Sequence, residues 1–154
     1  MEGGILFTWG CGAHGQLGHV GDTSQRECPA IVSDLFSFGS LCVSCGGSST
    51  TVLDSRGRVF EFGTTTGGTG APGATVSSAT PREVVGLRKK TFTQVSSGGT
   101  FCVGIETGGT AWIWGEFLAK TTIPRPVSGV GGRVIQVSSG GAFSVLVVEG
   151  GVCF

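Results

Sequence analysis

Six cysteines are the residues of this 154-residue chain that could most directly carry chemistry. Cys42 and Cys45 have the C-x-x-C spacing of a zinc knuckle or a thiol redox pair. On a strand, residues three apart point to opposite faces of the sheet, which is a poor arrangement for chelating one metal ion. No second C-x-x-C and no H-x-x-x-H follows in the sequence. We therefore expect no metal site, and we expect small buried thiols in a reducing compartment.

The two histidines are the next candidates for chemistry. His14 and His19 flank the sequence GQLG at residues 15–18. A catalytic histidine needs a neighbouring nucleophile or carboxylate and an orienting partner, and the residues close by in sequence that could serve, Cys11, Asp22 and Ser24, form no known constellation. The glycine-rich stretches lack G-x-x-x-x-G-K-[ST], and their glycines precede strands rather than a helix N-terminus. We predict no catalytic residue and no cofactor, and thus a protein that is not an enzyme.

A pattern that occurs three times organises the chain and must position these residues. The sequence VSCGGSSTTVLDSRGRVFEFG (residues 43–63) returns as VSSGGTFCVGIETGGTAWIWG (95–115) and as VSSGGAFSVLVVEGGVCF (137–154). Each copy reads as a strand, a tight turn at a glycine and a second, aromatic strand. Residues 5–10 (ILFTWG) match the aromatic strand alone. Self-similarity of this kind indicates a repeat architecture whose units bury their faces on one another.

Positions that recur in every unit are expected to serve packing. The tryptophans and their aligned phenylalanines recur in this way, so we expect them to pack between units: Trp9, Trp112, Trp114, Phe60, Phe62 and Phe154. The small residues of the Val-Ser-Ser-Gly-Gly strands are expected to let backbones approach closely. Cys45 aligns with Ser97 and Ser139, which further disfavours a metal site.

Composition points to an all-β protein. Thirty glycines among β-branched residues, with only 13% charged residues, indicate many short strands joined by tight turns. We read residues 64–78 as one polar, glycine-rich loop. The net charge is zero, so no direct nucleic-acid partner is expected from bulk electrostatics. No apolar run reaches the roughly 18 residues of a membrane span, and residues 1–10 show no signal peptide. We expect an intracellular location, cytoplasmic or nuclear.

The first unit carries the most specific motif. FTWG at residues 7–10 is followed by GAHGQLG at 12–18, Cys-Pro at 28–29, VSCGG at 43–47 and LDSRGRVF at 53–60. This succession closely resembles the repeat of the regulator of chromosome condensation family, and the resemblance covers essentially the whole chain. The second and third loops lack GQLG, and the position of the family's histidine after the glycine pair holds Ser49, Phe101 and Phe143. Kelch repeats carry a Tyr downstream of their glycine pair, whereas this chain has no Tyr.

The resemblance implies a fold and an organisation. In that family each unit is a four-stranded blade of a β-propeller, usually closed with seven blades. We therefore expect residues 1–154 to be a single repeat domain, all-β, forming a partial β-propeller of about three four-stranded blades. The expected units are residues 5–57, 58–109 and 110–151, with 152–154 starting a further strand. An open arc leaves sheet edges unpaired. The remaining blades would belong to a longer chain of which this sequence is a part, to another protein or to further copies of this chain. The isolated monomer should be poorly soluble.

Two functions agree with such a fold. The first is a protein–protein interaction module or scaffold, because loops on a rigid framework are where binding residues concentrate. The alternative, implied by the resemblance, is part of a guanine nucleotide exchange factor for a Ran-type small GTPase. We expect protein contacts in the loop at 11–27 and in the basic stretch at 82–90. The residues assigned to them are His14, Gln16, His19, Asp22, Arg82, Arg88, Lys89 and Lys90.

Overall fold

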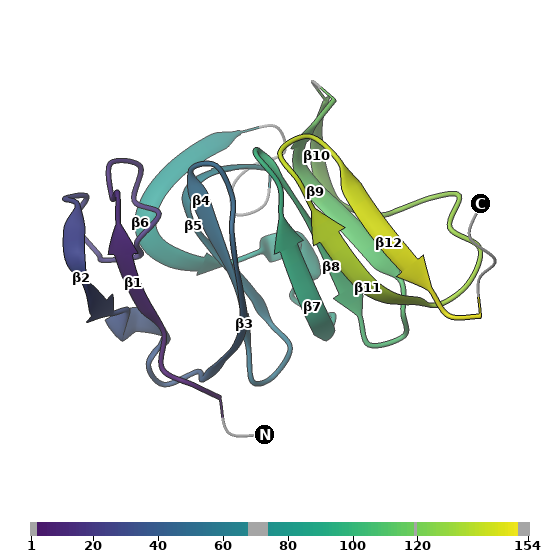
Figure 1. Cartoon of the computed structure of the whole chain (residues 1–154), viewed down its shortest axis with the longest axis horizontal. Coiled ribbons are helices and arrows are strands. Elements are labelled where there is room, and N and C mark those ends of the chain that lie inside the picture. Colours follow the sequence, from purple (N-terminus) through teal and green to yellow (C-terminus); the bar gives the residue numbers. More distant parts are fainter. Residues whose placement is uncertain (1–2, 68–73, 119, 151–154) are drawn as a thin grey trace.

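The chain forms an arc of antiparallel sheets, as seen in the computed structural model, which describes residues 3–67, 74–118 and 120–150 (Figure 1). The first four-stranded sheet has the order β3 (Ser40–Cys45), β4 (Ser49–Asp54), β5 (Val59–Thr66) and β6 (Thr75–Glu83). The second has the order β7 (Phe92–Ser97), β8 (Phe101–Glu106), β9 (Ala111–Phe117) and β10 (Lys120–Pro126). The described residues therefore contain two complete blades.

Two smaller sheets lie at the ends of the arc. β1 (Phe7–Gly10) pairs with β2 (Arg26–Ile31), and β11 (Val134–Ser139) pairs with β12 (Ser144–Val148). The repeat alignment makes β1–β2 the counterpart of β5–β6, the outer half of a blade. β11–β12 is the counterpart of β3–β4, the inner half. The predicted partial propeller of about three blades is confirmed, with two complete blades between two half-blades.

The four prolines among the described residues lie in the outermost strands of three of the sheets. Pro29 is in β2, Pro81 in β6, and Pro124 and Pro126 in β10. Proline cannot donate to a strand ladder, so it is tolerated at an edge. Short 3₁₀ turns, η1 (Ser33–Leu35) and η2 (Val85–Leu87), follow β2 and β6 and lead into the inner strand of the next blade. No helix within the described residues has the length and apolar character to cross a membrane.

The expected loop at residues 64–78 was largely wrong. β5 runs on to Thr66 and β6 begins at Thr75, with Thr64 facing Ser77 and Thr66 facing Thr75 across the ladder. Threonine is β-branched and favours extended backbone, so this polar stretch continues the hairpin instead of ending it. Residues 68–73 lie outside the described residues.

The inner strands of successive blades touch through small residues. The Ser97 N–H donates to Ser44 Oγ (2.8 Å), and one blade further on the Ser139 N–H donates to Ser96 Oγ (2.9 Å). In the same way the Gly99 N–H donates to the carbonyl of Gly141 (2.8 Å). The close backbone approach expected from the Val-Ser-Ser-Gly-Gly pattern is confirmed. Serine and glycine are small enough to leave room for it.

Apolar cores fill the spaces between blades. One joins the two complete blades through Leu53, Val59, Phe92 and Trp114, and others lie on either side of it. The expected burial of the recurring aromatics is confirmed for Phe60, Phe62 and Trp114. Trp112 is half-buried, and Phe154 lies outside the described residues.

The same expectation was wrong for Trp9. Its aligned residues, Phe62 and Trp114, are each 1% exposed, whereas Trp9 is 60% exposed. The reason is positional: β5 and β9 each have an inner neighbour, β4 and β8, while β1 pairs only with β2 among the described strands. A recurring core residue therefore lies open on this edge.

Most of the cysteines that the structure describes are accessible, contrary to the expectation of buried thiols, and Cys153 lies outside the described residues. Cys102 is buried, but Cys11, Cys28 and Cys45 are exposed and Cys42 is half-buried. Cys45 lies on β3, whose outward positions have no covering blade among the described residues. Cys102 lies between blades, with its Sγ 3.2 Å from Thr51 Oγ1, and burial raises the pKa of this thiol.

A buried carboxyl group crosses the interface between the two complete blades. Glu61 on β5 is 2% exposed, and its Oε1 accepts a hydrogen bond from Trp114 Nε1–H on β9 (2.6 Å). Among the described residues, no hydrogen bond to its Oε2 is formed. Burial raises the pKa of Glu61, since a desolvated carboxylate is penalised relative to the neutral acid.

A methyl group at the inter-blade glycine contact should destabilise the fold. A Cβ at Gly99 would lie 2.7 Å from the Gly141 carbonyl oxygen, so we expect Gly99→Ala to lower the free energy of unfolding by about 1–3 kcal/mol in urea denaturation. Gly108→Ala is the matched control, because a Cβ there meets nothing within 4 Å. Equal losses in both variants would show that the close approach does not limit packing.

Glu61 should make stability depend on pH. Its folded pKa is raised, so proton uptake favours the folded state; this stabilisation is fully present below the unfolded pKa and is lost as pH rises through the folded pKa. We expect the free energy of unfolding of Glu61→Gln, relative to wild type, to increase with pH by up to about 1.4 kcal/mol per unit. Denaturation from pH 4 to 8 measures this. Glu116→Gln, at an exposed position, should track wild type.

Candidate functional site

The loop between β1 and β2 (residues 11–25) is the candidate site. It contains the GQLG motif and folds into consecutive turns, in which the Gly15 N–H donates to the Gly12 carbonyl (2.7 Å) and the Gly18 N–H donates to the Gly15 carbonyl (3.0 Å). The His14 N–H donates to Gln16 Oε1 (2.8 Å), so the Gln16 side chain closes the middle turn. The motif thus specifies a local backbone shape.

Two glycines let this loop pack tightly on the neighbouring blade. Gly15 has φ +80°, and a Cβ there would lie within 2.7 Å of the Ala79 backbone on β6. Gly18 has φ +75°, and its Cβ would lie 2.9 Å from the Phe62 ring. Both positions need a residue that has no side chain and tolerates positive φ.

Hydrogen bonds fasten the loop to the first complete blade. Thr50 Oγ1 on β4 donates to the Gln16 carbonyl (2.8 Å), and Ser77 Oγ on β6 donates to the His14 carbonyl (3.1 Å). The loop therefore extends from the outer strands of one blade and rests on the end of the next.

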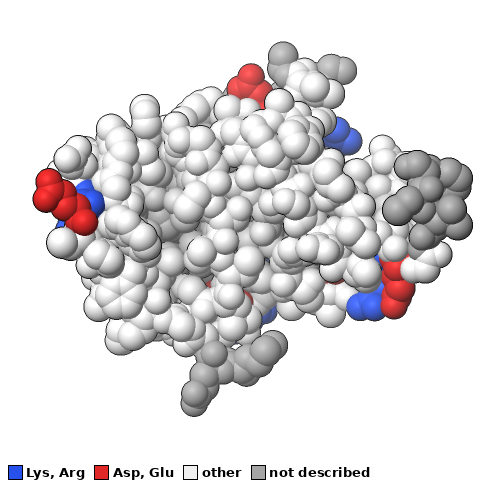
Figure 2. All heavy atoms as spheres, in the orientation of Figure 1, with Lys and Arg blue, Asp and Glu red and all other residues white. Residues whose placement is uncertain are grey.

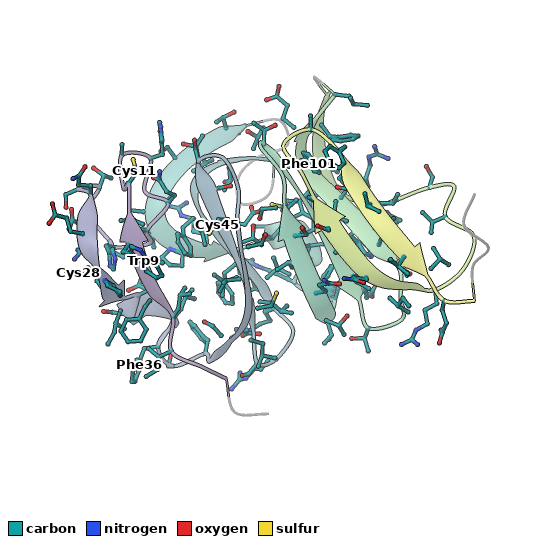
Figure 3. The ribbon with its side chains drawn as sticks, in the orientation of Figure 1. Trp9, Cys11, Cys28, Phe36, Cys45 and Phe101 are labelled. Atoms are coloured by element: carbon teal, nitrogen blue, oxygen red, sulfur yellow. The ribbon has the colours of Figure 1, made fainter. Side chains whose placement is uncertain are left out.

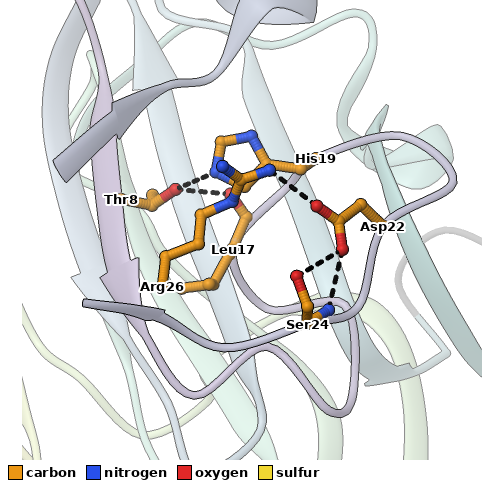
Figure 4. A network of polar contacts seen from close by, with 6 residues as sticks. All are labelled: Thr8, Leu17, His19, Asp22, Ser24 and Arg26. Carbon is orange, nitrogen blue, oxygen red and sulfur yellow. Dashed lines mark hydrogen bonds and ion pairs between the residues drawn. The ribbon is translucent and has the colours of Figure 1, made fainter. Parts of the chain in front are cut away.

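A polar network holds the second half of the loop (Figure 4). Asp22 Oδ1 accepts from the Ser24 N–H (2.9 Å) and from Ser24 Oγ (2.6 Å), while Arg26 donates to Asp22 Oδ2 (2.7 Å). Thr8 Oγ1 on β1 donates to the Leu17 carbonyl (2.6 Å) and lies 3.1 Å from His19 Nε2. Because the single hydroxyl proton of Thr8 goes to Leu17, His19 Nε2–H is the donor in that contact.

The network shifts two ionisation equilibria. Hydrogen bonds from Ser24 lower the pKa of Asp22, assisted by the Arg26 charge. The pKa of His19 is also lowered, first by partial burial and then by the Arg26 charge, while the Asp22 charge acts in the opposite direction. Asp22 is therefore a carboxylate and His19 favours its neutral form at physiological pH.

The structure separates the predicted contact residues by role. His14 is exposed, whereas Gln16, His19 and Asp22 are half-buried and shape the loop. Sequence reasoning missed Thr8 and Arg26, which complete the network. The Asp-x-Ser spacing at 22–24, typical of a side chain that bonds to the backbone two residues on, was the available signal.

The basic stretch at 82–90 lies elsewhere. The GQLG loop contacts β6 at Ser77 and Ala79, whereas Arg82 lies near the end of that strand and residues 88–90 lie between η2 and β7. Arg82 and Lys89 are exposed, and Arg88 Nε lies 3.8 Å from Glu83. Lys90 Nζ lies 3.4 Å from Glu106 and 4.2 Å from the centre of the Trp112 ring, which gives it a packing role.

A metal site and a catalytic histidine were the other kinds of site considered from the residue types. In residues 3–67, 74–118 and 120–150, His, Cys, Asp and Glu side chains form no group of three or more that could hold a metal ion. The Asp22–His19 region lacks a nucleophile placed against the imidazole, since His19 bonds to Thr8 and Thr8 bonds to a carbonyl.

The chain is similar to proteins of a known repeat family. Residues 3–53, which include the loop and its network, match the family model of the regulator of chromosome condensation (RCC1) repeat. The chain therefore contains an RCC1 repeat. Human HERC2, an E3 ubiquitin-protein ligase, is 27% identical over 160 residues, which cover 96% of this chain and 3% of HERC2.

Solved structures agree on the fold. Human WBSCR16 superposes with a TM-score of 0.82 at 22% identity, over 95% of this chain and 40% of that protein. Prp20p from Saccharomyces cerevisiae superposes with a TM-score of 0.75 at 19% identity, over 92% of this chain and 39% of that one. The RCC1-repeat chain thus spans less than half of each of these proteins.

The charges around His19 should move its pKa in opposite directions. We expect the pKa of His19 to fall further in Asp22→Asn, which removes the charge that raises it, and to rise in Arg26→Gln, which removes a charge that lowers it. Titration of the imidazole signals by NMR measures both. Glu27→Gln, an exposed change on β2, should leave the His19 titration unchanged. Shifts of the same sign in the first two variants would contradict the network.

Proposed function

We propose that this RCC1-repeat chain is a protein-interaction module without catalysis of its own, and that its principal contact surface is the GQLG loop. The proposal includes a single repeat domain over residues 1–154 with units 5–57, 58–109 and 110–151. It also includes an intracellular location, cytoplasmic or nuclear. The fold supports the general role, since propellers of this family present loops on a rigid scaffold.

One observation carries the proposal: the loop is fixed in shape although its tip is exposed. Bonds from Thr8, Thr50 and Ser77 hold its backbone, while His14, Val20 and neighbouring side chains stay accessible. A surface ordered before binding loses little conformational entropy when a partner docks, which is the physical advantage of preorganisation.

The basic stretch is proposed as a second, smaller contact. Arg82 and Lys89 are free to meet an acidic partner, whereas Lys90 is occupied by Glu106 and Trp112. Exposed charges of this kind mainly accelerate association and select against wrong partners.

Nucleotide exchange on a Ran-type small GTPase is the alternative. Its support is the likeness in fold to Prp20p, whose structure was described with its binding to Gsp1p and histones. An exchange factor must remodel the nucleotide site of its partner and needs loops from many blades. This chain spans 39% of Prp20p, so the exchange activity is the less favoured proposal.

Affinity capture with matched variants tests the loop. We expect a partner recovered with wild type to be lost with the double variant His14→Glu and Val20→Glu, which changes exposed positions and leaves the network intact. Ser128→Glu, an exposed change in another turn, should retain it. The affinity of the purified pair should fall by roughly tenfold or more in the loop variant. Loss with the Ser128 control, or retention with the loop variant, would contradict the assignment.

A nucleotide release assay separates the two functions. Purified Ran-type GTPase loaded with a fluorescent GDP should release nucleotide at the same rate with and without the chain. Acceleration that depends on the loop would establish the exchange function in place of the proposed one. Lys89→Glu tested in the same assay reports whether the basic stretch contributes.

A further inference from the structure

A small cavity of about 10 Å³ lies where the two complete blades meet. It is bounded by residues of β4, β5, β8 and β9 and by the turn before β8. Phe101, labelled in Figure 3, is one of these residues and begins β8. The volume is about the minimum that one water-sized group requires. The cavity therefore suits a single small occupant.

Glu61 on β5 contributes a carboxyl group to this cavity. The residue is 2% exposed, and Trp114 Nε1–H donates to its Oε1. Among the described residues, no hydrogen bond to Oε2 is formed. One oxygen of the carboxyl group is thus already bound, and the other is left for whatever fills the cavity. A buried polar atom of this kind costs free energy unless it is paired.

The position of Glu61 does not need a carboxyl group for packing. Its counterpart in the second complete blade is Ile113 on β9, which is 8% exposed and belongs to an apolar cluster with Val103 and Val137. Thr51, which faces Glu61 across β4–β5, has Val103 as its counterpart. The same two positions are therefore apolar at the next interface between blades. The polar pair at the first interface has a chemical reason rather than a packing one.

Among the described residues, no basic side chain forms an ion pair with Glu61. The titratable group beside it is the Cys102 thiol on β8, whose pKa is raised by burial, so this thiol stays neutral. Trp114, Cys102 and Thr51 favour the ionised form of Glu61, but they carry no positive charge. A buried carboxylate is ordinarily neutralised by a proton or paired with a cation.

The hydrogen bond from Trp114 is typical of an ionised acceptor. Trp114 Nε1 lies 2.6 Å from Glu61 Oε1. This is shorter than the roughly 2.7–3.2 Å of most N–H···O bonds. Hydrogen bonds to a charged acceptor are the short ones. The geometry therefore favours a carboxylate, which requires a positive charge beside it.

Neutral oxygen atoms complete the surroundings. Five other residues that line the cavity carry a hydroxyl group: Ser49, Thr64, Thr65, Thr66 and Thr100. Thr100 Oγ1 donates its proton to the Glu116 carbonyl (2.8 Å), and a hydroxyl oxygen that donates still has lone pairs to offer a cation. Hydroxyl and carbonyl oxygens together with a carboxylate are the ligands that hard cations prefer.

We propose that this cavity between the blades binds one monovalent cation of the size of potassium or ammonium, held by Glu61 Oε2 and by neutral oxygens of the lining residues. A single positive charge balances a single carboxylate, whereas a divalent ion would leave an excess charge buried. Potassium and ammonium are close to water in size, which matches the cavity. The ion would join β5 of one blade to the next blade.

The site goes beyond the proposed function. The described residues that line the cavity lie outside the GQLG loop, so the two proposals can fail independently. The metal groups excluded above consist of three or more His, Cys, Asp or Glu side chains, which a monovalent ion does not require. Figure 2 shows very few basic side chains on the face over β3 and β7, the inner strands of these two blades. A cation that approaches this face meets little repulsion.

Titration of the Trp114 indole N–H signal by NMR tests the site. The protein is held in tetramethylammonium chloride, whose cation is too large for the cavity, and potassium chloride replaces that salt at constant ionic strength. We expect the Trp114 signal to shift and to saturate, because the indole donates to the carboxyl group that binds the ion. Ammonium chloride should act in the same way.

Matched variants assign the response to Glu61. Glu61→Gln and Glu61→Ile should each lower the affinity for potassium by roughly tenfold or more. Glu61→Ile introduces the residue type found at the counterpart Ile113, so it keeps an apolar interface of a kind that the chain already forms. Glu116→Gln, an exposed change on β9, should bind potassium as wild type does.

The ion and the proton compete for the same oxygen. Only the carboxylate binds a cation, so the apparent affinity for potassium should fall by up to about tenfold for each pH unit below the pKa of Glu61. Titrations from pH 4 to 8 measure this dependence. A cation that binds elsewhere on the surface would not follow the ionisation of Glu61.

A further ligand separates two sources of the same chemistry, a free ion and the ammonium end of a lysine side chain from a bound protein. n-Propylammonium carries that end on a short alkyl chain. A Glu61-dependent shift with n-propylammonium supports the site and identifies a lysine as a ligand that fits it. A shift with potassium and ammonium alone supports the site and identifies the free ion.

The remaining outcomes contradict the proposal. It is overturned if the Trp114 signal does not move with potassium or ammonium, or if the response persists in Glu61→Gln. In either case Glu61 is balanced by a proton alone. Because the Glu61 variants leave the residues of the GQLG loop unchanged, failure here does not affect the loop capture experiment.

Discussion

The close approach of inner strands near the propeller axis is the constraint on which the rest of the structure depends. Serine and glycine at the ends of β3, β7 and β11 bring neighbouring backbones close enough to hydrogen-bond directly, for example from the Ser97 N–H to Ser44 Oγ. With the inner strands fixed at this distance, the sheets must fan outward. The apolar cores then fill the widening space between blades with larger side chains such as Phe62 and Trp114. Small residues at one end of each blade and aromatic ones further out are thus parts of one packing solution.

The candidate site follows from the same blade-to-blade packing. The GQLG loop departs from β1 but rests on β6 and on the ring of Phe62, so its shape depends on the neighbouring blade being in place. Gly15 and Gly18 permit this contact, and Asp22 fixes the remainder of the loop by binding Ser24 and Arg26. An exposed surface is thereby held by buried contacts, which is how a repeat scaffold can present a defined binding surface without a separate binding domain.

A half-blade lies at each end of the described arc. The repeat alignment places two outer strands at one end of the arc and two inner strands at the other, and each half leaves apolar side chains open where a complete blade buries them. Among the described residues, Trp9 lacks a facing strand in its own sheet, whereas Phe143 lacks a following blade of the kind that covers its counterpart Phe101. Sheet edges of this kind associate readily because their backbone N–H and C=O groups are unpaired and their apolar side chains are exposed.

Much of the fold was determined by the sequence itself. The recurrence of Val-Ser-Ser-Gly-Gly and of the aromatic strands predicted a repeat architecture, the close strand contacts and the burial of Phe60, Phe62 and Trp114, because these depend on local pattern and on neighbours with the same pattern. The propeller was implied by the resemblance of the first unit to a known repeat family. The sequence also placed His14 in an exposed loop. Only the tertiary structure decided that Gln16, His19 and Asp22 shape that loop, that Thr8 and Arg26 complete the network, and that Lys90 packs on Trp112. Only it decided that Trp9 and Cys45 are open. Whether a side chain is buried or exposed depends on which strands lie opposite it. The repeat pattern does not show this where a neighbouring unit differs from the other units or is absent.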